Sequence, residues 1–217
     1  MPRLPESGFD RAAPFYDRLA RLVYGNALEQ SQQALLPFIP NHARVLVIGG
    51  GSGWLLEQLL LTGKKLDILY LDASPAMLRR AKQRYGQLIP SHTCTVTFRL
   101  GTEQALGPQD QFEVIITPFL LDLFPPERLK RLMATLAAAL LPNGNWLFAD
   151  FWPVQQPPPL WQRLLIRSMY TFFGAISGVE ARKLPEYGSF FRQLGFRQQY
   201  SSSFCHGMVQ AKVFSRP

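Results

Sequence analysis

The sequence predicts an α/β fold with a doubly wound, mostly parallel sheet of seven strands covered by helices on both faces. Two observations lead to this prediction. Through the middle of the chain, short apolar runs that suit buried strands alternate with amphipathic helical stretches. The chain then ends in two β-like runs, 196–204 and 208–215, joined at His206-Gly207, which are typical of an antiparallel hairpin. A length of 217 residues suits one such domain.

Five apolar runs are the expected parallel strands. Each is short and rich in Val, Ile, Leu or Phe, as strands buried on both faces are. They are residues 44–48, 66–71, 93–100, 112–117 and 145–151.

The expected helices between these strands are marked at both ends. Serine or proline residues, which favour helix starts, precede three amphipathic stretches. They are Ser52, Ser74-Pro75 and Pro125-Pro126. Gly86 and Asn143-Gly144 follow two of these stretches, where we expect left-handed residues that end the helices.

We expect a single domain with four parts. Residues 1–42 carry apolar and aromatic positions at helical spacing and are predicted to form helices that act as a lid, while 43–151 form the core. In 152–184, a proline-rich segment leads into the apolar helical run 160–179, an insertion after the fifth strand. Residues 185–217 supply a short helix and the hairpin.

The composition argues against several functional classes. No apolar run suits a signal peptide or a membrane span, so we expect a cytoplasmic protein. Cys94 and Cys205 lack the spacing of a zinc site, so no metal is expected. The net charge of +8 comes from basic residues scattered along the chain, without a basic run, and nucleic acid is not an expected partner.

A glycine-rich turn is the main functional signal. Gly49-Gly50-Gly51-Ser52-Gly53 follows an expected strand and opens a helix, where glycine lets the backbone approach a ligand closely. Asp72 ends the second strand, and a carboxylate there can accept hydrogen bonds from two ribose hydroxyls. A cap for the following helix is the alternative role of Asp72. The turn predicts a nucleotide-like cofactor.

Four motifs in order resemble those of class I S-adenosylmethionine-dependent methyltransferases. They are VLVIGGGSGWLLEQLL, LYLDASPAMLRRAKQR, FRLGTEQAL and FEVIITPFLLDLF. The resemblance spans about residues 9 to 151 and implies a Rossmann-like methyltransferase fold with S-adenosyl-L-methionine as cofactor. A nicotinamide-dependent oxidoreductase is a remote alternative, because Trp54 stands where the dinucleotide fingerprint needs a small residue.

The resemblance implies a set of cofactor-binding residues. Gly49, Gly51 and Gly53 would surround the methionine moiety, Asp72 the ribose, Ala73 and Met77 the adenosine, and Thr117 would face the sulfonium. Thr102 stands where the family often has an aspartate that reads the adenine amino group, so either Thr102 or Glu103 serves there.

The chain also departs from the family at Val47, where an acidic residue usually helps to hold the amino group of the cofactor. A repurposed, non-catalytic fold that acts as a binding module is therefore an alternative function.

The acceptor is expected over the ends of strands four and five, where Asp122 could orient or deprotonate it and Asp150 could hold it or a lid residue. Capping or salt-bridging carboxylates are the alternative for both. The N-terminal segment is similar to ubiquinone and menaquinone biosynthesis methyltransferases, in which a pair like Tyr16-Asp17 lies near the cofactor. Thr117-Pro118-Phe119-Leu120 stands where amino methyltransferases have an Asn-Pro-Pro-Tyr type of sequence, so C- or O-methyl transfer is expected. The apolar insertion suits a small hydrophobic acceptor such as a quinone, phenol, polyketide or polyene.

The run LWQRLLIRSMYTFFGAISGV, with Arg163 and Arg167 interleaved, allows three interpretations. It would line an acceptor pocket, rest on a membrane surface as a peripheral contact, or pack against a second subunit in a homodimer.

Overall fold

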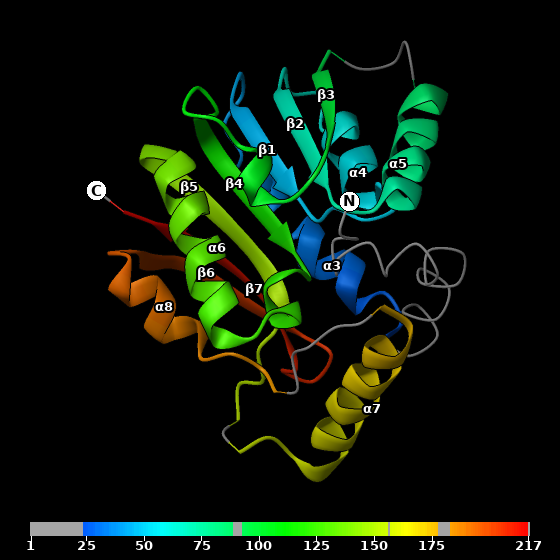
Figure 1. Ribbon diagram of the computed structural model, residues 1–217, viewed down its shortest axis with the longest axis vertical. Coiled ribbons are helices and arrows are strands. Elements are labelled where there is room, and N and C mark those ends of the chain that lie inside the picture. Colours follow the sequence, from blue (N-terminus) through cyan, green and yellow to red (C-terminus); the bar gives the residue numbers. More distant parts are fainter. Residues whose placement is uncertain (1–23, 89–92, 156, 178–182, 217) are drawn as a thin grey trace.

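The computed structural model describes residues 24–88, 93–155, 157–177 and 183–216, and contains one seven-stranded sheet in the order β3-β2-β1-β4-β5-β7-β6 (Figure 1). The strands are β1 (Arg44–Ile48), β2 (Asp67–Asp72), β3 (Thr95–Leu100), β4 (Phe112–Pro118), β5 (Leu140–Phe151), β6 (Arg197–Phe204) and β7 (Val209–Ser215). Strands β1 to β5 pair in parallel, and β7 runs antiparallel to both β5 and β6. The predicted fold class and its terminal hairpin are confirmed.

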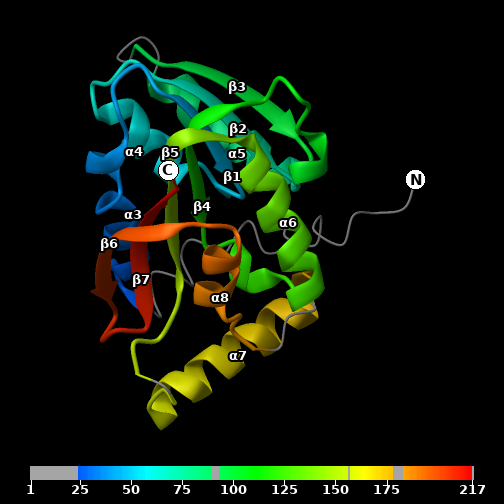
Figure 2. The same ribbon diagram turned by 90° about the vertical axis from the view of Figure 1, so that its left-hand side faces the viewer.

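Helices cover both faces of the sheet. They are α3 (Ala27–Gln33), α4 (Trp54–Leu61) and α5 (Pro75–Leu88) on one face, and α6 (Pro126–Ala139) and α8 (Tyr187–Gln193) on the other. Figure 2 shows α3 and α4 on one side of the sheet and α6 and α8 on the opposite side. Short 3-10 turns are η2 (Leu36–Phe38), η3 (Glu103–Ala105) and η4 (Leu121–Leu123).

The alternation of side chains along β1 explains this layering. Val45 and Val47 pack into the core on the α3–α5 face, whereas Leu46 and Ile48 pack into the core on the α6–α8 face. All four are at most 4% exposed, so β1 is apolar from Val45 to Ile48, as a strand covered on both faces must be.

Helix α7 (Leu160–Ser177) lies beyond the edge of the sheet where β5 ends (Figure 1). It packs through Ile166, Met169 and Tyr170 against Phe151 and Val209 in a third apolar cluster. The predicted insertion therefore lies at the carboxyl ends of the parallel strands. Neither α7 nor another helix in the described ranges has the length and hydropathy needed to cross a bilayer.

Two predicted helix ends are wrong. Gly86 lies within α5, which continues to Leu88. Helix α6 ends at Ala139, and Asn143-Gly144 lie in β5 at an irregularity between the pairs Phe112↔Leu140 and Val114↔Asn145. Asn143 is left-handed, with φ 60°, but it serves this bulge and not a helix end. A Cβ on Gly144 would lie 2.9 Å from the Glu113 carbonyl oxygen, so glycine is needed because two backbones approach closely.

One predicted helix start is confirmed by its cap. The Ser74 hydroxyl accepts a hydrogen bond from the Met77 amide at 3.1 Å, and Pro75 is the first helical residue. Helix α4 begins at Trp54, with left-handed Gly53 as its N-cap in place of Ser52. The predicted N-terminal lid lies mainly in residues 1–23, outside the described part of the chain.

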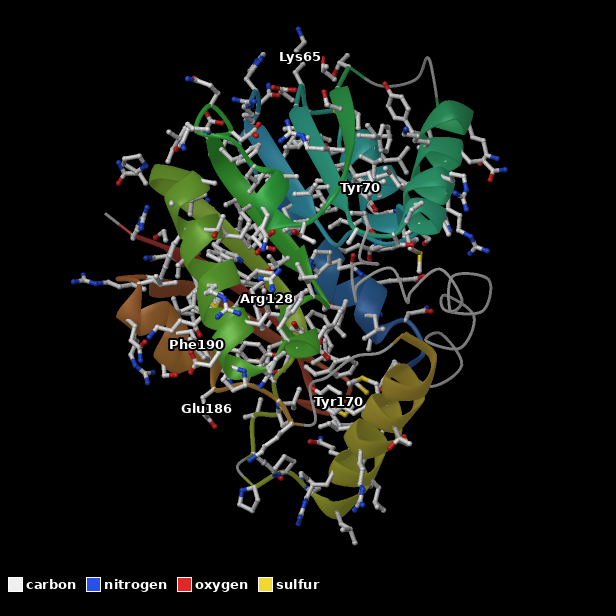
Figure 3. All side chains as sticks on the ribbon, viewed as in Figure 1. Lys65, Tyr70, Arg128, Tyr170, Glu186 and Phe190 are labelled. Carbon is white, nitrogen blue, oxygen red and sulfur yellow. The ribbon has the colours of Figure 1, made fainter. Side chains whose placement is uncertain are left out.

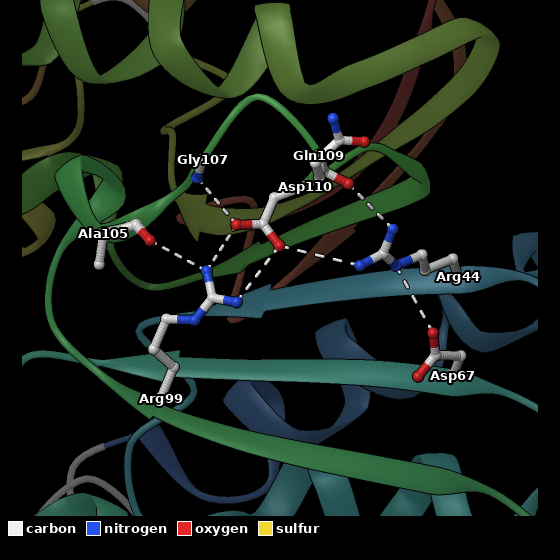
Figure 4. A network of polar contacts seen from close by, with 7 residues as sticks. All are labelled: Arg44, Asp67, Arg99, Ala105, Gly107, Gln109 and Asp110. Carbon is white, nitrogen blue, oxygen red and sulfur yellow. Dashed lines mark hydrogen bonds and ion pairs between the residues drawn. The ribbon is translucent and has the colours of Figure 1, made fainter.

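An ion-pair network fixes the connection between η3 and β4 (Figure 4). The two terminal nitrogens of the Arg99 guanidinium lie 2.6 and 3.3 Å from the Asp110 carboxylate, which also accepts from the Gly107 amide at 2.8 Å. Arg44 approaches the same carboxylate at 3.8 Å. The hydrogen bond from Arg99 is the main cause that lowers the pKa of Asp110. The network holds the loop after β3 against the sheet.

Candidate cofactor and acceptor sites

The strand order places a crevice at β1. This strand pairs with β2 on one side and with β4 on the other, so the chain winds outward from it in both directions. Open α/β sheets bind ligands outside the carboxyl ends of the strands at such a reversal. The glycine turn leaves β1 at this point.

The glycine turn is packed tightly at both ends and open in the middle. Gly49, Gly51 and Gly53 have φ of 69°, 63° and 91°, which glycine adopts without strain. A Cβ on Gly49 would lie 2.7 Å from Leu120 Cδ1, and one on Gly53 would lie 2.7 Å from Ala81 Cα. A Cβ on Gly51 would meet no described atom within 4 Å. The backbone is therefore accessible to a ligand at Gly51.

Asp72 connects this turn to α5. Its carboxylate is almost fully buried and accepts from the Gly51 amide at 3.0 Å and from the Ser74 amide at 2.9 Å. Ala73 is half-buried beside it, and Met77 is buried in the first turn of α5. The structure thus brings together Gly51 and the residues predicted to contact the ribose and adenosine. Asp72 accepts from the Ser74 amide just before α5, whereas the Ser74 hydroxyl caps the helix at the Met77 amide.

Tyr70 contacts the glycine turn from strand β2. The sequence did not lead us to predict this contact. Tyr70 is fully buried on β2 (Figure 3), and its hydroxyl donates to the Gly51 carbonyl at 2.9 Å. A Cβ on Gly50 would lie 2.5 Å from this hydroxyl, which explains the glycine there. Val47 is the register partner of Tyr70 and is fully buried. The signal in the sequence was a tyrosine, with its polar hydroxyl, among the Ile and Leu residues of the strand DILYLD.

The two alternatives for the adenine position differ in their partners. The Glu103 carboxylate is 4% exposed and forms a two-point ion pair with the Arg128 guanidinium, with N–O distances of 2.7 and 2.8 Å. The Thr102 hydroxyl accepts from the Gln104 amide at 3.3 Å and keeps a hydrogen to donate. Thr102 is therefore better suited to meet a ligand than Glu103.

Thr117 lies in the core. Its side chain is fully buried, and its hydroxyl accepts from Trp146 Nε1 at 3.0 Å, on the face covered by α6 and α8. The Thr117 hydroxyl therefore serves as the hydrogen-bond acceptor for the Trp146 indole. The contact with a sulfonium remains a prediction.

The two predicted acceptor-side carboxyls lie together at the ends of β4 and β5. Asp150 is fully buried, and its two oxygens accept from the amides of Phe151 at 2.8 Å, Leu121 at 3.1 Å and Asp122 at 3.3 Å. Burial raises the pKa of Asp122 to about 7 and raises the pKa of Asp150 well above its usual value, with a further increase from the Asp122 charge. The pair therefore retains a proton at neutral pH.

Three tyrosines surround this pair, and the sequence reasoning singled out none of them. Tyr170 donates from its hydroxyl to the Asp122 carbonyl at 3.2 Å (Figure 3). Burial and then carboxylate charge raise the pKa of Tyr24, Tyr170 and Tyr187. Asp122 Oδ1 and the Tyr187 hydroxyl are buried without a hydrogen-bond partner in the described part of the chain. Tyr16, which was predicted to lie near the cofactor, is outside the described residues.

The seven-stranded sheet, with the glycine turn at the reversal of strand order, is a Rossmann-like fold of the methyltransferase type. Residues 45–144 match the family model described as a methyltransferase domain. The chain is 28% identical over 152 residues to malonyl-[acyl-carrier protein] O-methyltransferase of Halorhodospira halophila, covering 70% of this chain and 49% of that protein. It thus spans about half the length of this relative.

Solved structures share the whole fold at low identity. Magnesium protoporphyrin IX methyltransferase from Synechocystis with bound S-adenosylhomocysteine has a TM-score of 0.73 and 15% identity, covering 97% of this chain and 98% of that one. An O-methyltransferase family 2 protein from Planctomyces limnophilus, in complex with apigenin, has a TM-score of 0.70 and 16% identity, covering 95% and 62%. The predicted methyltransferase-type fold is confirmed.

Proposed function

We propose that the protein transfers a methyl group from S-adenosylmethionine to an oxygen or carbon of a small, largely apolar acceptor such as a quinone, phenol, polyketide or polyene. The main observation behind the proposal is the glycine turn. It is open at Gly51, and the Gly51 amide donates a hydrogen bond to the carboxylate of Asp72. The matched methyltransferase domain supports it.

The residues present fit this cofactor. Gly49, Gly51 and Gly53 would hold its methionine moiety, and Asp72 its ribose hydroxyls. Ala73, Met77 and Thr102 would border the adenosine. The hydroxyl of Tyr70 donates to the Gly51 carbonyl and so holds the turn in place. Val47 supplies no carboxylate for the amino group of the cofactor, so backbone carbonyls or another side chain would hold that group. When bound, the cofactor supplies an already activated methyl group.

The protein groups on the acceptor side would position the acceptor and accept its proton. A group with a pKa near the working pH is the most effective general base, and burial brings the pKa of Asp122 to about 7. Asp150 acts as a positioning residue, because its carboxyl holds the backbone at Leu121 and Asp122. The aromatic surroundings exclude water from the reacting atoms.

Calorimetric titration with S-adenosylhomocysteine tests the cofactor site without knowledge of the acceptor. We expect micromolar or tighter binding, and at least about a tenfold loss of affinity in Asp72→Ala, since a hydrogen bond to a charged group is worth about 1.5–3 kcal/mol. Asp67→Ala is the matched control, because Asp67 is an exposed carboxylate at the start of the same strand. Absence of binding would contradict the proposal and favour the partner-binding alternative, and stabilisation by NAD instead would favour the oxidoreductase.

The exposed apolar tip of the molecule supports a peripheral membrane contact. Val154, Leu160, Trp161 and Leu164 are 64, 69, 45 and 60% exposed, and Arg163 and Arg167 lie on the same helix. Aliphatic, tryptophan and arginine side chains together suit the interface of an anionic bilayer. We expect co-sedimentation with phosphatidylglycerol vesicles that the double variant L160S/L164S loses.

Leu61→Ser is the control for this contact, because Leu61 is similarly exposed on α4, at 61%. Equal vesicle binding by wild type and the double variant would contradict a contact through this tip. A homodimer in sedimentation that L160S/L164S dissociates, without vesicle binding, would assign the tip to a subunit interface instead.

A further inference from the structure

A cavity of about 550 Å³ lies between α7 and the segment 183–187 that leads into α8. Helix α7 contributes Arg163, Ile166, Arg167 and Tyr170, whose spacing of three and four residues puts them on one helix face. Figure 3 shows Tyr170 and Glu186 on the two sides of this region. The cavity is part of neither the glycine turn nor its Asp72 contact.

Positive charge dominates the lining of the cavity. Arg163 and Arg167 on α7 and Lys183 on the opposite wall are exposed, and Glu186 is the acidic lining residue. Among the described residues, no carboxylate oxygen lies within 4.0 Å of a side-chain nitrogen of these three cations. Two guanidiniums one turn apart repel each other, and a shared anion would remove that repulsion.

Aromatic side chains form the inner part. Trp152 and Tyr187 line the cavity with ring centroids 5.2 Å apart, and Tyr170 is buried beside them. The Tyr187 side chain is 1% exposed, yet its buried hydroxyl has no hydrogen-bond partner in the described ranges. Because buried polar groups are normally paired, this hydroxyl is available to form a hydrogen bond with a ligand that enters the cavity.

Packing contacts link the cavity to the glycine turn. The hydroxyl of Tyr170 donates to the Asp122 carbonyl, and Asp122 lies two residues after Leu120, whose side chain packs on Gly49. The short 3-10 turn η4 therefore connects the wall of the cavity to Gly49, the first residue of the glycine turn.

We propose that this cavity is the acceptor subsite and that it selects a flat, aromatic acceptor carrying a carboxylate. Arg163 and Arg167 would hold the carboxylate, since guanidinium groups match its planar geometry, while Trp152, Tyr170 and Tyr187 contact the rings. Lys183 adds charge at the opposite wall. The inference rests on the proposed methyl transfer for its biological role, but binding to the cavity can be measured without it.

The test uses two probes of the same shape, the anion 1-hydroxy-2-naphthoate and its neutral carboxamide, titrated against the full chain with and without S-adenosylhomocysteine. We expect the acid to bind at least about tenfold more tightly than the amide, as a charge-assisted contact predicts. In the double variant R163Q/R167Q the two probes should bind with similar affinity. The control is Arg131→Gln, an exposed arginine on α6 outside the cavity, which should keep the preference.

Tyr187→Phe separates a binding role from a structural one. Loss of an unpaired buried hydroxyl should raise the melting temperature of the free protein, whereas affinity for the acid should fall several-fold. Equal binding of acid and amide by wild type, or no binding of either by protein that binds S-adenosylhomocysteine, would overturn the proposal. Failure to bind S-adenosylhomocysteine, with the acid preference intact, would overturn the methyl-transfer function and leave the carboxylate site standing.

Discussion

The two halves of the crevice differ in how their polar groups are paired. On the side of β1 and β2, both oxygens of Asp72 accept backbone amides, and the Tyr70 hydroxyl donates to the glycine turn. On the side of β5, α7 and α8, three buried oxygens lack a partner among the described residues: Asp122 Oδ1, Gln162 Oε1 and the Tyr187 hydroxyl.

Under the proposed function, this difference separates cofactor binding on one side from acceptor binding on the other. A cofactor site can be built mainly from backbone, which the strand and helix ends position, so its polar groups also satisfy one another. An acceptor site must take its polar groups from side chains. Side-chain oxygens that have no hydrogen-bond partner in the protein can then form hydrogen bonds with a bound ligand. The contrast can be tested within each half by matched substitutions.

The largest expected effect distinguishes two glycines of the turn. In Gly53→Ala the new methyl group would meet the Ala81 backbone at 2.7 Å, in addition to the strain at φ 91°, so we expect a loss of about 3 kcal/mol in the free energy of unfolding. Gly51→Ala adds a methyl group in open space and should cost about 1 kcal/mol, yet should weaken S-adenosylhomocysteine binding, because the methyl group obstructs the open backbone. Denaturant unfolding and calorimetry measure both. Equal effects of the two variants on stability would contradict this distinction.

The paired carboxyls should respond in opposite directions. Asp150→Asn removes an acceptor for buried amides and should destabilise the fold by about 2 kcal/mol. Asp122→Asn should stabilise it at alkaline pH. An aspartate has a pKa of about 3.9 when unfolded, and its increase to about 7 in the fold means that stability is full below about pH 4 and is lost as the pH rises through 7.

Thermal melts of wild type and Asp122→Asn at pH 4.5 and 8 measure this dependence. The advantage of the variant should grow to an order of 2–4 kcal/mol at pH 8. An advantage that is independent of pH would show that Asp122 carries no buried charge.

A smaller effect is expected at Tyr70. Tyr70→Phe leaves the Gly51 carbonyl without this donor, so we expect a loss of about 1 kcal/mol in stability and a several-fold weaker affinity for S-adenosylhomocysteine. Tyr85→Phe is the control, because Tyr85 packs against the same Phe98 ring from α5. Unchanged affinity in Tyr70→Phe would mean that the turn does not depend on this hydroxyl.

The proposed cofactor half was easier to predict from the sequence than the proposed acceptor half, and the reason is physical. Glycine at a strand end and an acidic residue at the next strand end have local geometric causes, so the motif predicts that Gly51 and Asp72 lie together, as they do. Tyr24, Tyr170 and Tyr187 come from three distant segments and meet through tertiary packing.

The same limit explains the mistaken end of α6. Asn143-Gly144 has the residue types of a helix end, but strand pairing with β4 extended β5 back to Leu140. Likewise, the partners of Glu103 and Thr117, namely Arg128 and Trp146, lie far along the chain, so their involvement in the core was not visible in the sequence.

The most direct test of the central claim, that the β1–β2 half holds the cofactor, is amide hydrogen exchange measured with and without S-adenosylhomocysteine. We expect slower exchange in peptides that cover 48–56 and 70–78, which contain the glycine turn and Asp72, and unchanged exchange in 183–193. Slower exchange confined to 183–193, or no change in the first two peptides at saturating ligand, would contradict the account.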